Sequence, residues 1–134
     1  NYTYTDMEIT EDRNASNIGQ TPVFVPDHTA NVWANYFVRS GTMSGLRVGG
    51  GVRYVGETVL NDTSDKNKGQ VPSYTLVDLS LGYDLGEVNS SLKNATANVV
   101  ANNIFNEEYY TCWNESYCWY GQEQTVEFNV NYEF

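Results

Sequence analysis

The sequence is poor in basic residues. Lysine and arginine together number 7, against 17 aspartate and glutamate residues, and the formal net charge at pH 7 is -10. Proteins that bind nucleic acids carry basic stripes that neutralise phosphates. This charge balance argues against a nucleic-acid partner, and the sequence shows no basic amphipathic helix of the kind that binds anionic lipid.

Long apolar runs are also missing. A transmembrane helix needs about 20 consecutive apolar residues, whereas only 40% of these 134 residues are hydrophobic. A membrane strand needs only about 9–11 residues, half of which can be polar, so the composition still allows strands that span a membrane. Aromatic residues make up 14% of the chain and include 11 tyrosines, which favour sites with one apolar side and one wet side.

Cysteine and histidine are scarce. The chain has two cysteines, Cys112 and Cys118, and one histidine, His28. A structural zinc site has four ligands and His28 lies far away in the sequence, so the Cys-x5-Cys spacing favours a disulfide across a short aromatic loop, in an oxidising compartment. The acids Glu107 and Glu108 have no nucleophile or base beside them, so we expect neither an enzyme nor a resident metal.

The sequence is rich in alternating polar and apolar residues. The stretch TVEFNVNYEF places a polar residue at every second position from Thr125, and it ends on Phe134. Alternation over such a length predicts β-strands. Six segments show it: residues 1–9, 29–38, 46–56, 74–85, 94–104 and 125–134.

The connectors between these segments differ in length. Residues 39–45 and 86–93 are short turns, whereas 10–28, 57–73 and 106–124 are long. In an antiparallel up-and-down meander, all short turns fall at one end and all long loops at the other, which is typical of outer-membrane barrels. Solvated charge is the simpler interpretation of the acids that gather in apparent loops, and a divalent-cation role is the alternative: Glu8, Glu11, Asp12, Asp62 and Asp65.

The two faces of the predicted strands differ in composition. One set of rows mixes Ala and Gly with Leu, Val and Tyr, which suits a fluid lipid better than a closely packed protein core. The other set is rich in Asn, Thr, Ser, Asp, Glu and Arg, which suits a watery lumen. We expect Arg47 and Arg53 to line that lumen, where they can pair with Asp78, Glu127 or Glu133. Tyrosines near strand ends are expected to form an aromatic girdle: Tyr36, Tyr54, Tyr83 and Tyr132.

Six strands cannot close a membrane barrel. The smallest such barrels have about eight strands, and an open edge in lipid leaves backbone groups unpaired. These strands must therefore pair either with more chain or with copies of themselves. We favour the first alternative, in which the sequence is a C-terminal piece of a larger barrel.

Several motifs in combination resemble a known family. They are GLRVGGGVRYVG, VPSYTLVDLSLGYDL, NNIFNEEYY, the Cys-x5-Cys loop and a terminal aromatic residue. The sequence resembles the end of TonB-dependent siderophore receptors, most closely the hydroxamate branch that serves ferrichrome, coprogen or ferrioxamine. The resemblance implies an all-β fold, in which residues 1–134 are the last six antiparallel strands of an outer-membrane barrel of about 22 strands.

The resemblance also implies a function and partners. It implies import of a ferric siderophore across the bacterial outer membrane, energised through TonB, with no cofactor besides the iron in the transported ligand. The plug and the TonB-contacting segment would lie outside these 134 residues. Outer-membrane lipid would surround the barrel, and the barrel assembly machinery would read a C-terminal signal that includes Tyr132 and Phe134.

The resemblance places ligand contacts in the last long loop, TCWNESYCWYGQE. The residue after its first cysteine, Trp113, is implied as a siderophore contact, and the further candidates in that loop are Tyr117, Trp119 and Tyr120. Aromatic walls with a few hydrogen-bond donors suit a compact, partly apolar complex. The alternative is that these rings pack the loop or lie at the outer lipid interface. A Cys112–Cys118 disulfide would hold the shape of the loop.

Two other classes of protein remain open. One is a structural or adhesion barrel that does not transport, and the other is a soluble secreted β-protein that binds a small ligand such as a sugar or lipid. Glycosylation would suit a secreted protein, but a chain this rich in Asn and Thr produces Asn-x-Ser/Thr triplets by chance. Six such triplets occur, at Asn1, Asn14, Asn61, Asn89, Asn94 and Asn114.

Overall fold

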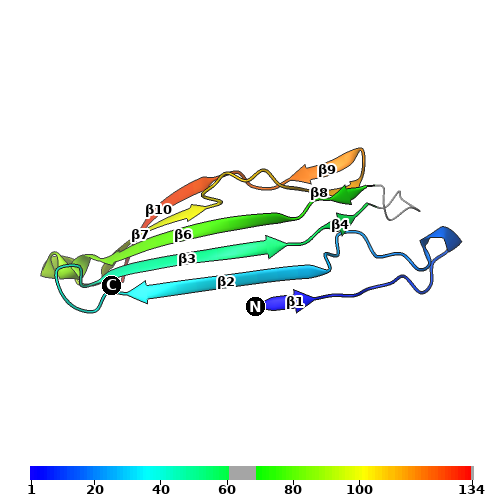
Figure 1. Ribbon diagram of the computed structural model, residues 1–134. Helices are drawn as coiled ribbons and strands as arrows, with labels where there is room; N and C mark the ends of the chain where they lie inside the picture. The colour runs from blue at the N-terminus through cyan, green and yellow to red at the C-terminus, as the bar shows by residue number, and fades with distance from the viewer. Residues whose placement is uncertain (61–68, 134) are drawn as a thin grey trace. The chain divides into compact units, whose positions relative to one another are not determined.

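The main feature of the computed structural model, which describes residues 1–60 and 69–133, is an antiparallel sheet of six strands (Figure 1). The order in the sheet is β1-β2-β3-β6-β7-β10. The strands are β1 (Tyr2–Tyr4), β2 (His28–Phe37), β3 (Leu46–Val55), β6 (Tyr74–Asp84), β7 (Ala95–Asn102) and β10 (Thr125–Tyr132). Within this sheet, each strand lies beside the sheet strand that comes before it in the sequence. The predicted all-β meander is therefore confirmed.

Smaller elements lie in the connectors. Two short ladders pair β4 (Thr58–Val59) with β5 (Gln70–Val71), and β8 (Tyr110–Asn114) with β9 (Tyr117–Tyr120). Three 3-10 turns complete the elements: η1 (Ala15–Asn17), η2 (Leu85–Glu87) and η3 (Ser90–Leu92). The sequence pattern did not predict the two ladders. Over the described ranges, no helix is long and apolar enough to cross a membrane.

The first strand is shorter than predicted. The prediction was residues 1–9, but β1 ends at Tyr4. Beyond Thr5, whose N–H still donates to the Asp27 carbonyl at 2.9 Å, the chain bonds to its own connector. Ile9 donates to the Gln20 carbonyl at 2.8 Å and accepts from the Gly19 N–H at 2.9 Å. The backbone hydrogen bonds of residues 5–9 are thus partly satisfied outside the sheet, which the local alternation did not reveal.

The chain divides into two compact units. The loop unit contains the long connectors, in Asn1–Asn31, Arg53–Thr75 and Glu107–Gln122. The sheet unit contains the central parts of the strands and the short turns, in Val32–Val52, Leu76–Asn106 and Glu123–Phe134. Phe134 itself lies outside the described residues, as do Asn61, Asp62 and Asp65.

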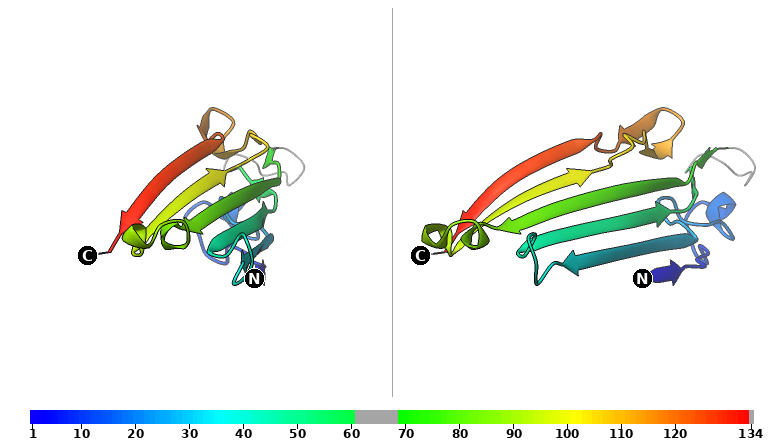
Figure 2. Two further views of the ribbon diagram at one scale, coloured as in Figure 1. Left: turned by 90° about the vertical axis from the view of Figure 1, so that its left-hand side faces the viewer. Right: turned by 60° about the vertical axis from the view of Figure 1, so that its left-hand side comes forward.

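One face of the sheet unit is apolar and uncovered. The register places Phe128 opposite Val99, which in turn lies opposite Leu81. Phe128 is 69% exposed and Leu81 is 52% exposed, and Figures 1 and 2 show these strands as a single layer. The apolar rows therefore do not meet each other in a dry interior. An apolar hollow of about 210 Å³ lies on this face, between Val48, Leu79, Leu81, Val99 and Ala101.

Tyrosines mark one end of this apolar face. Tyr83 lies opposite Ala97 and Tyr132 lies opposite Ala95, so both share the apolar face. Tyr36 occupies the apolar row of β2 one residue before its end and is 69% exposed. These three residues lie at the short-turn end of their strands, where an interfacial girdle is expected.

The opposite face of the sheet unit is polar. The amide of Asn98 donates to Asn129 Oδ1 at 3.3 Å, and Asn131 donates to the same oxygen at 3.3 Å. The amide of Asn102 donates to Thr125 Oγ1 at 3.3 Å. The Asp78 carboxylate accepts from the Asn103 N–H at 2.8 Å. The predicted separation into an apolar and a polar row is thus confirmed for β6, β7 and β10.

A tryptophan lies flat on the polar face over two glycines. The Trp33 ring covers Gly49 and Gly51, both of which are buried beneath it. Its Nε1 donates to Asn35 Oδ1 at 3.0 Å. A Cβ at Gly51 would clash with the ring, so this strand has glycine there because the ring approaches the backbone closely.

Replacing Gly51 by alanine should therefore destabilise the folded protein by about 1–2 kcal/mol, because the new methyl group must displace the Trp33 ring. Thermal unfolding measures the effect. In a Trp33→Ala background the same change should be nearly neutral, because no ring remains to displace. Equal losses in the two backgrounds would show that the ring does not cause the cost.

Candidate functional site

The last long connector folds into a disulfide-bonded hairpin. Cys112 of β8 lies opposite Cys118 of β9, and the two form a disulfide with a Cα–Cα distance of 4.0 Å. Asn114 closes the turn, since its Oδ1 accepts from the backbone N–H groups of Ser116 and Tyr117, both at 3.0 Å. The disulfide predicted from the spacing is present.

The hairpin is anchored by a small hydrophobic core in the loop unit. Cys112 is 3% exposed and packs with Leu60, Val71 and the partly buried Tyr110. Leu60 and Val71 belong to the β4–β5 region, so two long connectors share this core. The shape of the hairpin therefore depends on contacts between connectors and not on its own sequence alone.

The base of the hairpin is clamped by tyrosines. The Tyr109 ring stacks on Tyr74 with centroids 4.5 Å apart. It also lies against Gly121, where any side chain would clash with it. The Gly121 N–H donates to the Tyr109 carbonyl at 2.7 Å, and the Gln122 N–H donates to the Tyr109 hydroxyl at 3.2 Å. These contacts fix both ends of the hairpin to each other.

Three aromatic rings gather on one face of the hairpin. The Phe24 ring lies 5.9 Å from Trp113 and 6.3 Å from Trp119, centroid to centroid. All three side chains keep much of their surface open, at 40% for Phe24, 41% for Trp113 and 57% for Trp119. We call Phe24, Trp113 and Trp119 the aromatic platform. Open aromatic surfaces of this kind suit a compact, partly apolar ligand.

The other two candidate residues lie elsewhere on the hairpin. Tyr120 pairs with Tyr110, and their rings meet edge to face at 5.9 Å on the face that carries the cysteines. Tyr117 lies beside the turn, opposite Asn114, and is 65% exposed. Of the four loop residues predicted from the sequence, Trp113 and Trp119 both pack with Phe24. Tyr120 lies on the opposite face of β9, and Tyr117 lies two residues before Trp119, beside the turn.

Phe24 was not predicted as a site residue. It has a left-handed backbone, with φ of 64°, which is strained for a large residue. Such strain often marks functional segments. The signal in the sequence was the apolar triplet around Phe24, held between Pro22 and Pro26 in an otherwise polar connector.

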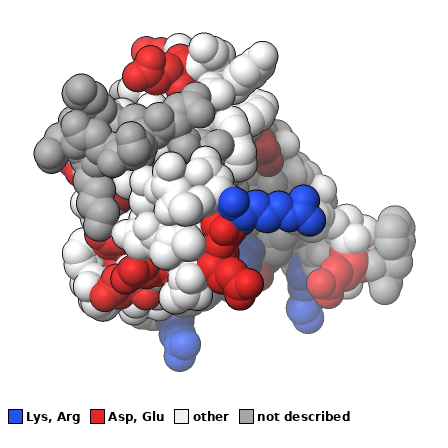
Figure 3. Space-filling model, turned by 90° about the vertical axis from the view of Figure 1, so that its right-hand side faces the viewer, with Lys and Arg blue, Asp and Glu red and all other residues white. Residues whose placement is uncertain are grey.

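The remaining polar candidates of the loop unit have structural or solvated roles. The His28 ring lies 5.1 Å from the Tyr4 ring, and its Nδ1 is 2.9 Å from the Tyr2 hydroxyl. In the view from the long-connector end, carboxylates stand at several separate places (Figure 3). Within residues 1–60 and 69–133, no group of three or more His, Cys, Asp or Glu side chains can hold a metal ion.

The family model and the most similar curated proteins indicate the same family. The family model "TonB dependent receptor-like, beta-barrel" matches residues 1–104. The "Ferrioxamine receptor" of Yersinia enterocolitica is 40% identical over 134 residues, which are 99% of this chain and 18% of that protein. The "Ferrichrome outer membrane transporter/phage receptor" of Escherichia coli (strain K12) is 39% identical over 134 residues, or 99% of this chain and 17% of that protein.

Solved structures show the same fold. The ferric preacinetobactin receptor BauA from Acinetobacter baumannii superposes with a TM-score of 0.77 at 23% identity, covering 96% of this chain and 18% of that one. The siderophore receptor PiuA from Acinetobacter baumannii gives a TM-score of 0.72 at 27% identity, covering 98% of this chain and 18% of that one. The chain thus spans less than a fifth of the length of these proteins.

Proposed function

The chain belongs to the TonB-dependent receptor β-barrel family. On this premise we propose that residues 1–134 form the C-terminal part of an outer-membrane transporter that imports ferric siderophores of the hydroxamate class and catalyses no reaction. Relatives named as ferrioxamine and ferrichrome receptors support the hydroxamate class. The observation that carries the proposal is the aromatic platform of Phe24, Trp113 and Trp119 on a disulfide-bonded hairpin.

The membrane location is supported by the sheet unit. Its apolar face is open, with Val126 66% exposed and Val130 55% exposed. Contact of such side chains with hydrocarbon has a lower free energy than contact with water. Outer-membrane lipid is therefore the proposed neighbour of this face, and the polar face lines the lumen. The exposed apolar rows argue against a soluble secreted protein.

The proposed receptor has two further protein partners, TonB and the barrel assembly machinery. The segment that contacts TonB and the plug would lie in the part of the polypeptide outside these 134 residues. The barrel assembly machinery would read the C-terminal strand, in which Tyr132 ends β10 on the apolar face and Phe134 follows it. The iron would arrive within the transported siderophore, so the receptor needs no cofactor of its own.

The aromatic platform is proposed to contact the siderophore. A ferric trihydroxamate is compact, neutral and partly apolar, and flat rings can pack against its ligand backbone without a charged partner. Trp113 and Trp119 are the main proposed contacts, joined by Phe24. Tyr117 and Tyr120 remain secondary candidates, because the rings that pack with Phe24 are those of Trp113 and Trp119.

The test is the affinity of the complete receptor for ferrioxamine B and ferrichrome. Replacing Trp113 by alanine removes one wall of the platform, and we expect the Kd to rise about tenfold, which corresponds to about 1.4 kcal/mol. Phe105→Ala is the control, because Phe105 is an exposed aromatic residue that is not among the candidate contacts. Equal affinity of wild type and the Trp113 variant would refute the proposed contact.

A separate experiment distinguishes transport from a purely structural barrel. Cells that produce the complete receptor should take up iron-55 supplied as ferrioxamine B or ferrichrome, and uptake should stop when TonB is absent. A receptor that assembles normally in the outer membrane and takes up neither complex would favour the structural or adhesion class.

A further inference from the structure

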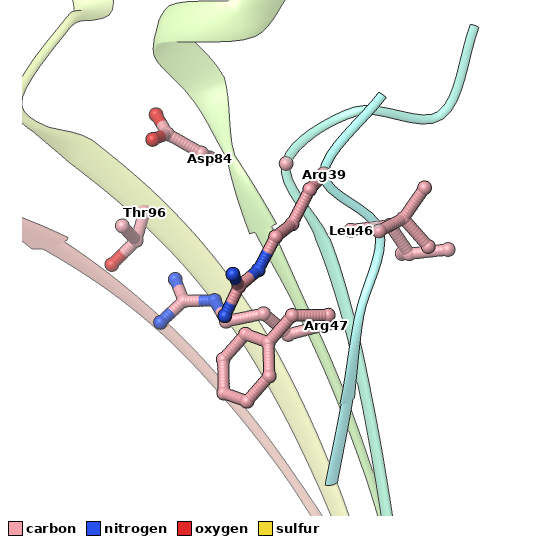
Figure 4. A pocket seen from close by; sticks show the side chains of 8 residues that line it. Arg39, Leu46, Arg47, Asp84 and Thr96 are labelled. Atoms are coloured by element: carbon pink, nitrogen blue, oxygen red, sulfur yellow. The ribbon is translucent and has the colours of Figure 1, made fainter. Parts of the chain in front are cut away.

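Two arginines share a pocket on the polar face of the sheet unit. The pocket has a volume of about 390 Å³ and lies at the short-turn end of the strands. Figure 4 shows the side chains of Arg39 and Arg47 both extending into it. The side chains that shape the pocket are Phe37, Arg39, Arg47, Asp84 and Thr96. This placement is notable because the whole chain has only 7 basic residues.

The pocket is short of negative charge. Among the described residues that line it, Asp84 is the only acid, and Asp84 Oδ1 accepts from the Gly86 N–H at 2.9 Å as the cap of η2. The Glu87 side chain lies close to Gly45 at the edge of the pocket. Figure 4 shows this carboxylate apart from both guanidinium groups. Two like charges held together repel each other unless an anion lies between them. The pocket therefore has the electrostatic character of a carboxylate or phosphate site.

The backbone beneath Arg47 is shaped to admit its side chain. Gly82 of β6 is buried, and a Cβ at this position would lie 3.3 Å from Arg47 Nε and 2.7 Å from Asn98 Oδ1. A side chain at position 82 would therefore push Arg47 away from its position across the sheet. The absence of one lets the guanidinium extend into the pocket, towards Thr96 (Figure 4).

We propose that Arg39 and Arg47 bind a carboxylate from the part of the receptor polypeptide that lies outside residues 1–134. Guanidinium groups form paired, charge-assisted hydrogen bonds with carboxylates. The pocket faces away from the apolar face, so the lipid proposed to contact that face does not reach it. This proposal rests on one part of the proposed function, namely that this chain belongs to a longer receptor polypeptide.

The length of the relatives favours this occupant. The chain covers 18% of the Yersinia enterocolitica relative, so most of such a polypeptide lies outside it. An acidic side chain of the same polypeptide is present at a high effective concentration, whereas a free anion must be bound from solution. The two arginines would bind a carboxylate of the polypeptide and a free anion through the same hydrogen bonds. The two tests below distinguish these occupants.

The first test is a cross-link in the complete receptor. In the Arg47→Lys variant, a carbodiimide should condense the lysine amine with the bound carboxyl group, forming an amide with loss of water. Mass spectrometry should find residue 47 joined to an aspartate or glutamate outside these 134 residues. A link to Asp84 alone, or none, would overturn the proposal. Arg13→Lys is the control, because Arg13 is exposed in the loop unit, and it should not give the same linked peptide.

The second test uses thermal unfolding and does not depend on lysine geometry or on siderophore binding. Arg39→Gln and Arg47→Gln should each lower the Tm of the complete receptor, and the double variant should lose less than the sum, because both arginines hold one group. Arg13→Gln should leave the Tm unchanged. If inorganic phosphate at constant ionic strength raises the wild-type Tm and this rise disappears in Arg47→Gln, the site takes a free anion and the proposal is wrong.

Discussion

Replacing Val130 by arginine should destabilise the membrane-inserted receptor by about 2–4 kcal/mol if the residue lies near the middle of the bilayer. Val130 is on the apolar face of β10, opposite Ala97, and is 55% exposed. In the proposed barrel this surface meets hydrocarbon, where a guanidinium loses its hydration without gaining a partner. The cost should therefore appear as reduced insertion and a lower free energy of unfolding.

Asn129→Arg is the matched control for Val130→Arg, because it introduces the same side chain one residue earlier on the same strand. Asn129 lies on the polar face, where it accepts hydrogen bonds from Asn98 and Asn131. The arginine there loses these weak bonds but stays hydrated, so its effect should be much milder. Equilibrium unfolding of the complete receptor in lipid vesicles measures both. Equal penalties for the two variants would contradict the assignment of the faces.

Breaking the Cys112–Cys118 disulfide should impair siderophore uptake more than barrel assembly. The bond closes a small ring, and in the chain-entropy description it contributes about 2–3 kcal/mol to the stability of the hairpin. Cys112 also belongs to the small core with Leu60 and Val71. Without the bond, Trp113 and Trp119 lose their fixed spacing towards Phe24, and we expect the aromatic platform to bind the siderophore less tightly.

Two variants separate the bond from the burial of Cys112. Cys118→Ala breaks the disulfide at an exposed position, whereas Cys112→Ser breaks it and also places a hydroxyl in the core. Both should reduce the uptake of iron-55, with a larger effect for Cys112→Ser. The amount of heat-modifiable, folded receptor in the outer membrane should change little, since β10 and β7 pair without the hairpin. Normal uptake by both variants would remove the proposed role of the disulfide.

The sequence by itself determined the six strands of the main sheet, apart from the end of β1, and which side chains share a face of each strand. Period-two alternation is a local property, because successive side chains of a strand point to opposite sides. The predicted and observed limits agree closely for the last strand, predicted as 125–134 and described as Thr125–Tyr132. The disulfide was also predictable, because the chain has only two cysteines at a spacing that a hairpin can bridge.

The sequence pointed to Trp113 and Trp119, but only the tertiary structure decided which residues from other segments lie beside them. Phe24 contacts Trp113 and Trp119, which lie 89 and 95 residues further along the chain, and no local pattern encodes these contacts. Arg39 and Arg47 likewise line one pocket only because the turn between β2 and β3 reverses the chain. The position of Arg47 also depends on a glycine in a third segment, Gly82. Alternation fixes which side a residue faces, but contacts between distant segments depend on how the connectors fold. The early end of β1 has the same cause, since residues after Tyr4 bond to their own connector.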